Sequence, residues 1–236
     1  MDANIARHSR AIHAFLAETH GWFEGSHCLG TEIPSRHEVQ SWGLAALDLA
    51  REHSFAIRTL LDPVHQPMLA SASALMRPLV EAVLRGYLFS YCGLSGGEVL
   101  QFQEGRNSYS IEPMILKIES TVPEAGRHLR PMVGGIERSL HRYTHGDVHQ
   151  LSRRLSQTQD EPTSKPLNVI RPLLDERDVI GVLYVVSRLT LLTLWAIVDQ
   201  SGDSQACASI NHRHEELDRL LDEAGHLFEE RSQVDG

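Results

Sequence analysis

Apolar side chains surround most of the helix that the sequence predicts over Leu69–Tyr91. They recur at four-residue spacing on two neighbouring lines: Leu75, Leu79, Val83 and Tyr87, then Met76, Val80, Leu84 and Leu88. A helix on a protein surface shows one apolar stripe, so this pattern indicates a helix that packs on most of its sides. Pro78 is expected to kink it, because proline lacks the backbone N–H that a helix needs. We therefore expect the fold to be built around this helix.

Further apolar patterns predict helices on both sides of the central one. Trp42–Leu61 and Val179–Val198 are apolar enough to pack against it. Pro131 suits the first turn of a helix that ends at Tyr143, and Thr144 suits the N-cap of a new helix after a break. The sequence therefore predicts an all-α fold, a bundle of about seven or eight helices around the kinked central helix.

We expect these helices to form a single domain over residues 1–236, a length that is ample for one core. Ser95 is predicted to cap a short helix that ends at Gln103. Residues 157–172 have a polar start and three prolines, which predicts a flexible loop. The last, charged helix is expected to fray at its C-terminal tail.

The stretch Val179–Val198 is long enough to cross a membrane, since it has twenty residues. Arg188 near its middle would cost about 2.5 to 3.5 kcal/mol in lipid. The flanking residues are acidic, with no basic collar to orient the segment. A buried helix of a soluble bundle is therefore the favoured interpretation, and we expect no membrane association.

Positive charge is concentrated in residues 127–154. This window has six arginines against one glutamate and one aspartate, on a chain with a net charge of −9. A local basic patch on an acidic protein suits a specific small anion or an RNA backbone as partner. The alternative is that these arginines only pair with acidic neighbours in the fold.

The cysteines indicate a reducing compartment. Cys28, Cys92 and Cys207 are odd in number and far apart, which is typical of reduced thiols. The N-terminus has no uninterrupted apolar run of the kind found in a secretory signal. We expect a cytoplasmic protein.

Reactive side chains gather in residues 138–149. A histidine titrates near neutral pH, and an arginine can stabilise charge on a phosphate. Such a pair suffices for RNA cleavage without a metal, because the 2′-hydroxyl supplies the nucleophile. Six residues separate Arg138 from His145, and Arg142 from His149. The other histidines, among them His212 and His214, have no comparable neighbours.

Two other interpretations of this segment stay open. His141, His145 and His149 are spaced by four, as metal ligands on one helix face would be. The break expected at Thr144 would misalign them, and no cysteine or paired glutamate completes a set, so we predict neither a metal nor a cofactor. Alternatively these imidazoles only form local hydrogen bonds, and Thr144 and Asp147 only cap a helix.

A narrow charged line runs along the central helix at four-residue spacing: Arg77, Glu81 and Arg85. Opposite charges at this spacing are neighbours on a helix and can pair. A charged line on a largely buried helix needs partners or a cleft. We therefore expect it to bind ligand together with the 138–149 segment, in one polar pocket.

Two motifs carry a resemblance to a known family. Arg77–Gly86 reads RPLVEAVLRG, and Tyr143–Gly146 reads YTHG. Together they resemble an uncharacterised bacterial helical family, recorded as a domain of unknown function with an RPLxEAxxRG helix and a THGG-type turn. Asp147 replaces the second glycine of that turn. The resemblance spans roughly residues 40–200 and implies an all-helical domain without an established activity.

The spacing of arginine and histidine also resembles, more loosely, the HEPN superfamily of helical RNases, which often form homodimers. This resemblance implies a metal-independent RNase or RNA-binding protein in bacterial defence or a toxin–antitoxin system. His145 would be the acid and base, Arg138 and Arg142 the phosphate contacts, and His149 an auxiliary group. The alternative hypothesis is a non-enzymatic binding or regulatory module that holds a small anion or a segment of a protein partner.

Overall fold

The central helix, α3, begins at Leu69 and ends at Tyr91, the bounds that the apolar pattern predicts. Its residues Leu79, Val83 and Tyr87 are fully buried. Pro78 lies inside α3, which continues on both sides of it. The apolar residues on several sides of the predicted helix thus correctly indicated that α3 is the central helix of the bundle.

The computed structural model describes residues 14–20, 22, 38–62, 68–105, 110–144, 155–158, 167–170 and 176–234. Residues 14–20 are helical. The other described helices are α2 (Glu38–Leu61), α3, α4 (Gly96–Gln103), α5 (Ile111–Thr121), α6 (Pro123–Thr144), α8 (Glu176–Ser201) and α9 (Ser204–Val234). The fold is all-α, as predicted, with one small hairpin attached.

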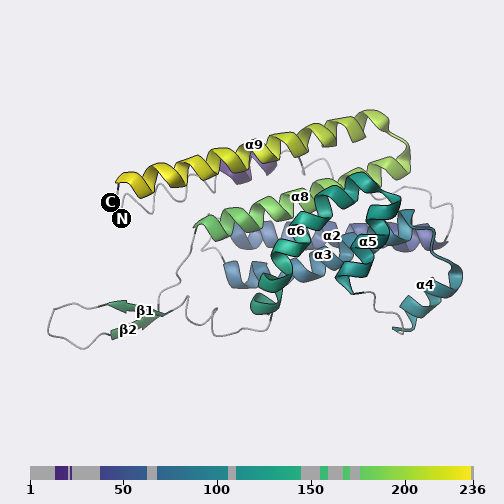
Figure 1. Ribbon diagram of the computed structural model, residues 1–236, viewed down its shortest axis with the longest axis horizontal. Helices are drawn as coiled ribbons and strands as arrows, with labels where there is room; N and C mark the ends of the chain where they lie inside the picture. Colours follow the sequence, from purple (N-terminus) through teal and green to yellow (C-terminus); the bar gives the residue numbers. More distant parts are fainter. Residues whose placement is uncertain are drawn as a thin grey trace.

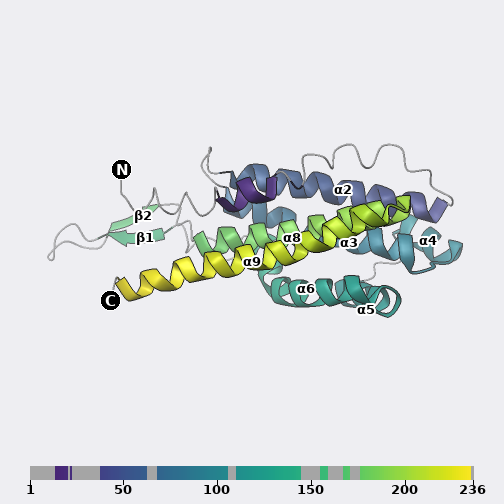
Figure 2. The ribbon, with the colours of Figure 1, turned by 90° about the horizontal axis from the view of Figure 1, so that it is seen from above.

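The helices form layers around α3 (Figures 1 and 2). α3 contacts α2, α5, α6 and α8. α2 lies on one side of the α3 and α8 layer, and α5 and α6 lie on the other side. α9 lies along α8 at the edge of the bundle, so that α8 separates α9 from α2.

The apolar helix α8 is part of the core. Among the described residues one helical stretch, Asp178–Ser201, is long and apolar enough to cross a membrane, and 72% of its most apolar window is buried in the bundle. Leu183, Val186 and Leu189 are fully buried. A core helix passes the same test of length and hydropathy, and this burial is what a core helix shows. The cytoplasmic location stays a prediction.

Two tyrosines tie α3 to α8 at matching positions. The Tyr87 hydroxyl donates to the carbonyl oxygen of Leu192 at 2.8 Å. One turn further along both helices, the Tyr91 hydroxyl lies 3.1 Å from the carbonyl oxygen of Ala196. Tyr87 is fully buried, so its hydroxyl needs a partner within the protein. These bonds fix how α3 lies along α8.

The predicted start of the basic helix was wrong. α6 begins at Pro123, and Pro131 lies in its interior. The first turn of a helix leaves backbone N–H groups without an intrahelical partner, so a proline fits there at no cost, and Pro123 takes that position. α6 ends at Thr144, where we expected a break. The new helix expected after Thr144 lies outside the described residues.

The structure confirms the prediction that Ser95 caps a short helix, α4. The Ser95 hydroxyl accepts from the backbone N–H of Glu98 at 3.3 Å, and the Glu98 carboxylate accepts from the backbone N–H of Ser95 at 2.8 Å. Lys117 on α5 also donates to Glu98. These bonds, the backbone one first, lower the pKa of Glu98 to about 2, so the cap carries its charge under all ordinary conditions.

A two-stranded hairpin that the sequence pattern did not predict follows α6. β1 (Leu155–Thr158) pairs antiparallel with β2 (Leu167–Ile170), so that Leu155 lies opposite Ile170. Figure 1 shows this hairpin beyond one end of the helical bundle. The end of β1 and all of β2 fall within the segment for which we expected a flexible loop.

Gly86→Ala is expected to destabilise the fold by about 1 to 2 kcal/mol, even though alanine favours a helix over glycine. A Cβ at Gly86 would lie 2.5 Å from Cδ2 and 2.6 Å from Cγ of Leu47 on α2, and Leu47 is fully buried. The chain offers a matched control in Gly181, a helical glycine around whose added Cβ the described part of the chain leaves open space.

Gly181→Ala should therefore stabilise the protein by up to about 1 kcal/mol. Urea unfolding of the wild type and both variants measures the difference. Equal stability of the two variants would show that Leu47 moves aside without cost and that α2 and α3 are not in tight contact there.

Candidate functional site

The three charged residues that we predicted to form a line on α3 make ion pairs with one another. Arg77 Nε lies 3.0 Å from Glu81 Oε1, and Arg85 Nη2 lies 3.1 Å from Glu81 Oε2. The two arginine side chains are 39% and 48% exposed, so the pairs are in contact with solvent. The predicted pairing is confirmed, whereas a ligand-binding role for these three residues stays a prediction.

The predicted catalytic residues cannot be placed as side chains. Arg138 and Arg142 belong to α6, but only their backbone is described. His145 and His149 lie outside the described residues. The pocket that we expected between this segment and the charged line of α3 therefore stays a prediction, and so does the assignment of these four residues to catalysis.

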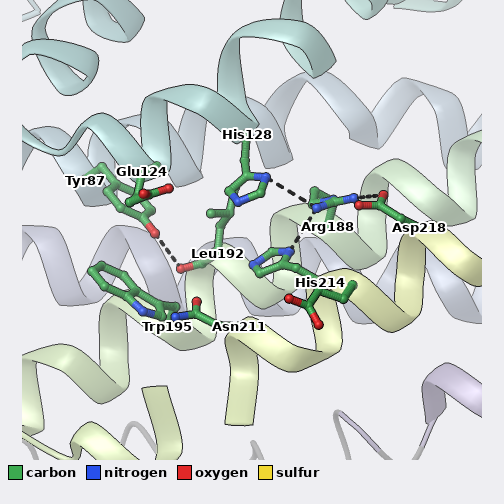
Figure 3. A pocket seen from close by; sticks show the side chains of 11 residues that line it. Tyr87, Glu124, His128, Arg188, Leu192, Trp195, Asn211, His214 and Asp218 are labelled. Atoms are coloured by element: carbon green, nitrogen blue, oxygen red, sulfur yellow. Dashed lines mark hydrogen bonds and ion pairs between the residues drawn. The ribbon is translucent and has the colours of Figure 1, made fainter. Parts of the chain in front are cut away.

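A different polar site lies where α3, α6, α8 and α9 meet. A cavity of about 340 Å³ opens there (Figure 3). Its lining comprises the buried or half-buried polar residues His128, Arg188 and His214, the walls Tyr87, Ala125, Leu192 and Trp195, and the exposed polar residues Glu124, Asn211, Glu215 and Asp218. We call this cavity the α6/α8/α9 pocket.

Helical periodicity brings these side chains to one place. On α8, Arg188, Leu192 and Trp195 are spaced by four and three residues, so they share one face. His214 and Asp218 have the same relation on α9. Each helix is continuous through its contributing residues, so the pocket is held by regular backbone.

Arg188 is the centre of the hydrogen-bond network beside the pocket. Only 5% of its side chain is exposed. Its Nη1 lies 3.3 Å from Nδ1 of His128 and 3.4 Å from Nδ1 of His214. Its Nη2 donates to the Tyr184 hydroxyl at 2.7 Å and to the carboxylate of Asp218. Four of the five guanidinium N–H groups thus have partners.

These contacts determine the tautomer of both histidines. A guanidinium only donates hydrogen bonds, so each Nδ1 that it contacts must be an acceptor without a proton. The proton of each neutral ring is then on Nε2. In Figure 3 the Nδ1 atoms of His128 and His214 point towards Arg188, and the Nε2 atoms point to the other side, into the pocket.

Both imidazoles are held in the neutral form. Burial, then the charge of Arg188, then His128 lower the pKa of His214 to about 3. Burial and Arg188 also lower the pKa of His128. The two rings stack with their centroids 4.8 Å apart and their planes 10° from parallel. The pocket therefore presents two Nε2–H donors, on two nearly parallel rings, at neutral pH.

The charges around the pocket are mostly negative. Arg188 is paired with Asp218, and Tyr184 donates a second hydrogen bond to the same carboxylate at 2.8 Å. Glu124 and Glu215 add two further carboxylates at the exposed side. Arg188 and the three carboxylates of the lining together carry a net charge of −2. This charge disfavours an anionic ligand, because four of the five N–H groups of Arg188 already donate to protein partners.

A metal site has no support in the described part of the chain. No group of three or more histidine, cysteine, aspartate or glutamate side chains there is arranged to hold a metal ion. The two imidazoles of the pocket also turn their Nδ1 atoms to a cation, Arg188, which occupies the position that a metal would need on that side.

Sequence reasoning missed this site. We interpreted Arg188 only as a cost to membrane insertion and set His214 aside because it has no reactive neighbours in the sequence. The signal that could have found the site is Arg188 itself, since a charge in the middle of a core helix must have buried polar partners. Which residues those partners are depends on the packing of α6 and α9 against α8.

Comparison with models of protein families finds a match over most of the chain. The model of a protein family described as a family of unknown function (DUF6988) matches residues 47–217. This range contains every residue that lines the pocket except Asp218. It agrees with the expected resemblance to a domain of unknown function, while the HEPN resemblance stays a prediction. No curated protein and no solved structure matched the chain.

Proposed function

We propose that this chain, which belongs to the family of unknown function DUF6988, is a non-enzymatic binding module for a small polar ligand. Because the function of the family is unknown, the proposal rests on the geometry of the structure. The α6/α8/α9 pocket is the binding site. The observation that carries the proposal is the pair of neutral imidazoles whose Nε2–H donors face an open cavity.

The size and lining of the cavity support a small molecule. About 340 Å³ lies within the range of pockets that hold small ligands. Trp195 and Leu192 offer apolar surface, and the imidazoles offer directed donors. Such pockets combine apolar walls with a few placed polar groups, which orient the ligand.

The same geometry supports binding over catalysis. A histidine that acts as a general base needs a pKa near the working pH, and the pKa of His214 is about 3. Arg188 has donors committed to two imidazoles, a tyrosine and a carboxylate, so it is not poised to stabilise a new negative charge. Among the described residues that line the pocket there is no serine, threonine or cysteine that could act as a nucleophile.

The metal-independent RNase hypothesis rests on side chains outside the described part of the chain, and it stays a prediction. The α6/α8/α9 pocket does not favour it, since a net charge of −2 opposes a phosphate. A homodimer and a protein partner also stay predictions from the sequence.

The variant Asn211→Trp tests the proposal. Asn211 is an exposed lining residue on α9, so a large ring there should fill the opening without disturbing the core. His212→Trp is the matched control, because His212 is its exposed neighbour and does not line the pocket. We expect ligand-observed NMR with a chemically diverse fragment library to find fragments that bind the wild type and His212→Trp but not Asn211→Trp.

Two outcomes would contradict the proposal. Fragments that bind all three proteins equally would place binding elsewhere on the molecule. A library that yields no ligand for the wild type would show that the cavity is only a packing defect around the Arg188 network.

A further inference from the structure

The two imidazole donors of the pocket act as a pair. Their planes are 10° from parallel, their Nδ1 atoms share one nitrogen of Arg188, and both Nε2 atoms lie on the side away from Arg188 (Figure 3). No hydrogen bond within the described residues involves either Nε2 atom. The fixed rings cannot turn to new partners without losing Arg188.

The spacing of the pair favours two acceptors. With ring centroids 4.8 Å apart, one oxygen midway between the donors would lie far from the direction of either N–H bond. Hydrogen bonds weaken steeply as they depart from linearity, so two separate acceptors fit the pair better than one shared atom. A ligand that satisfies the pair presents two acceptor atoms along one edge.

Charge decides between the chemical groups that carry two acceptors. Carboxylates and phosphates would place a negative charge beside Glu124, Glu215 and Asp218. Carbonyl groups provide the same acceptors without that charge. The Trp195 side chain, which lines the cavity on the side of Tyr87, adds an aromatic wall against which a planar ring can pack (Figure 3).

Resting on the proposed binding function, we propose that the α6/α8/α9 pocket selects an uncharged planar ligand with two carbonyl acceptors on one edge, and that it discriminates against anions. His128 and His214 donate one hydrogen bond each to the two carbonyl oxygens. Arg188 is a positioning residue that fixes their tautomer and direction. The carboxylates at the opening provide the discrimination.

Two pairs of probes test this on the wild-type protein by NMR titration. Orotamide and orotate have the same size and the same ring carbonyls but differ in charge, so orotamide should bind at least about tenfold more tightly. Uracil and 2-pyridone are both uncharged and differ in the number of carbonyls, so uracil should bind more tightly.

Removing the negative charges at the opening of the pocket tests whether they cause the discrimination against anions. Glu124 and Glu215 are exposed, so the double variant Glu124→Gln, Glu215→Gln should fold, and it should reduce the preference for orotamide over orotate. Glu223→Gln on α9 is the control, since Glu223 is exposed and does not line the pocket, and it should keep the preference.

Orotate binding as tightly as orotamide would overturn the charge selection, and 2-pyridone binding as tightly as uracil would overturn the two-acceptor geometry. Binding of none of the four probes would overturn the ligand class. The proposed binding function is tested separately by the fragment library with Asn211→Trp. If the four probes fail, fragments of another class that bind the pocket would still support the binding function, and a library without any ligand would contradict it.

Discussion

Replacing Arg188 with methionine is expected to lower the free energy of unfolding by about 3 kcal/mol. The side chain is 5% exposed and donates to two imidazoles, a tyrosine and a carboxylate. Methionine fills much of the volume but donates no hydrogen bond. His128 and His214 would each keep a buried Nδ1 acceptor without its donor, while Asp218, which is 56% exposed, could turn to water.

Arg188→Lys separates the charge from the shape of the group. Lysine keeps the positive charge, but its single ammonium cannot reach all four partners of the guanidinium fork. We expect it to recover only part of the lost stability in urea unfolding. If Arg188→Lys is as stable as the wild type, the network needs only a charge, and the argument for fixed imidazole tautomers fails.

The second large effect is on acid stability. Since the pKa of His214 is lowered from 6.5 to about 3 in the folded protein, the unfolded chain binds a proton there at a higher pH than the folded one does. Stability therefore falls as the pH falls below about 6.5, and it continues to fall until the folded form also binds the proton, near pH 3. Over two pH units this loss is on the order of 2 to 3 kcal/mol.

His214→Asn removes this titration, and its amide oxygen can still accept from Arg188. We expect the variant to lose less stability than the wild type on acidification from neutral pH, as measured by urea unfolding at a series of pH values. His212→Asn, at an exposed position of the same helix, is the control and should keep the wild-type slope. An unchanged slope in His214→Asn would show that His214 binds its proton at the same pH in the folded and the unfolded chain, and that burial and Arg188 do not lower its pKa.

The helices could be predicted from the sequence where their signals are local. The bounds of α3 follow from the apolar periodicity of Leu69–Tyr91, and the start of α4 follows from the Ser95 and Glu98 cap. The start of α6 was missed because two prolines compete for the first turn, and sequence alone does not tell which of Pro123 and Pro131 is tolerated in the interior.

The pocket could not be predicted in the same way. His128, Arg188 and His214 are far apart in the chain, and they meet only because α6 and α9 both pack against α8. Periodicity shows which face of a helix is polar, but it does not show which other helix that face meets. The density of arginine and histidine near residue 142 drew the prediction to a segment where the residues are neighbours in sequence.

The sequence RPLVEAVLRG at Arg77–Gly86 has a consequence for how the pocket of this fold can vary. Its charged residues Arg77, Glu81 and Arg85 pair with one another, and its Gly86 lets Leu47 of α2 approach. This stretch of α3 thus pairs its charges within the helix and uses only its glycine for the contact with α2. The pocket residues His128, Arg188 and His214 lie outside it. Substitutions in the pocket can therefore change its ligand while Arg77–Gly86, and with it the contact between α3 and α2, stays unchanged.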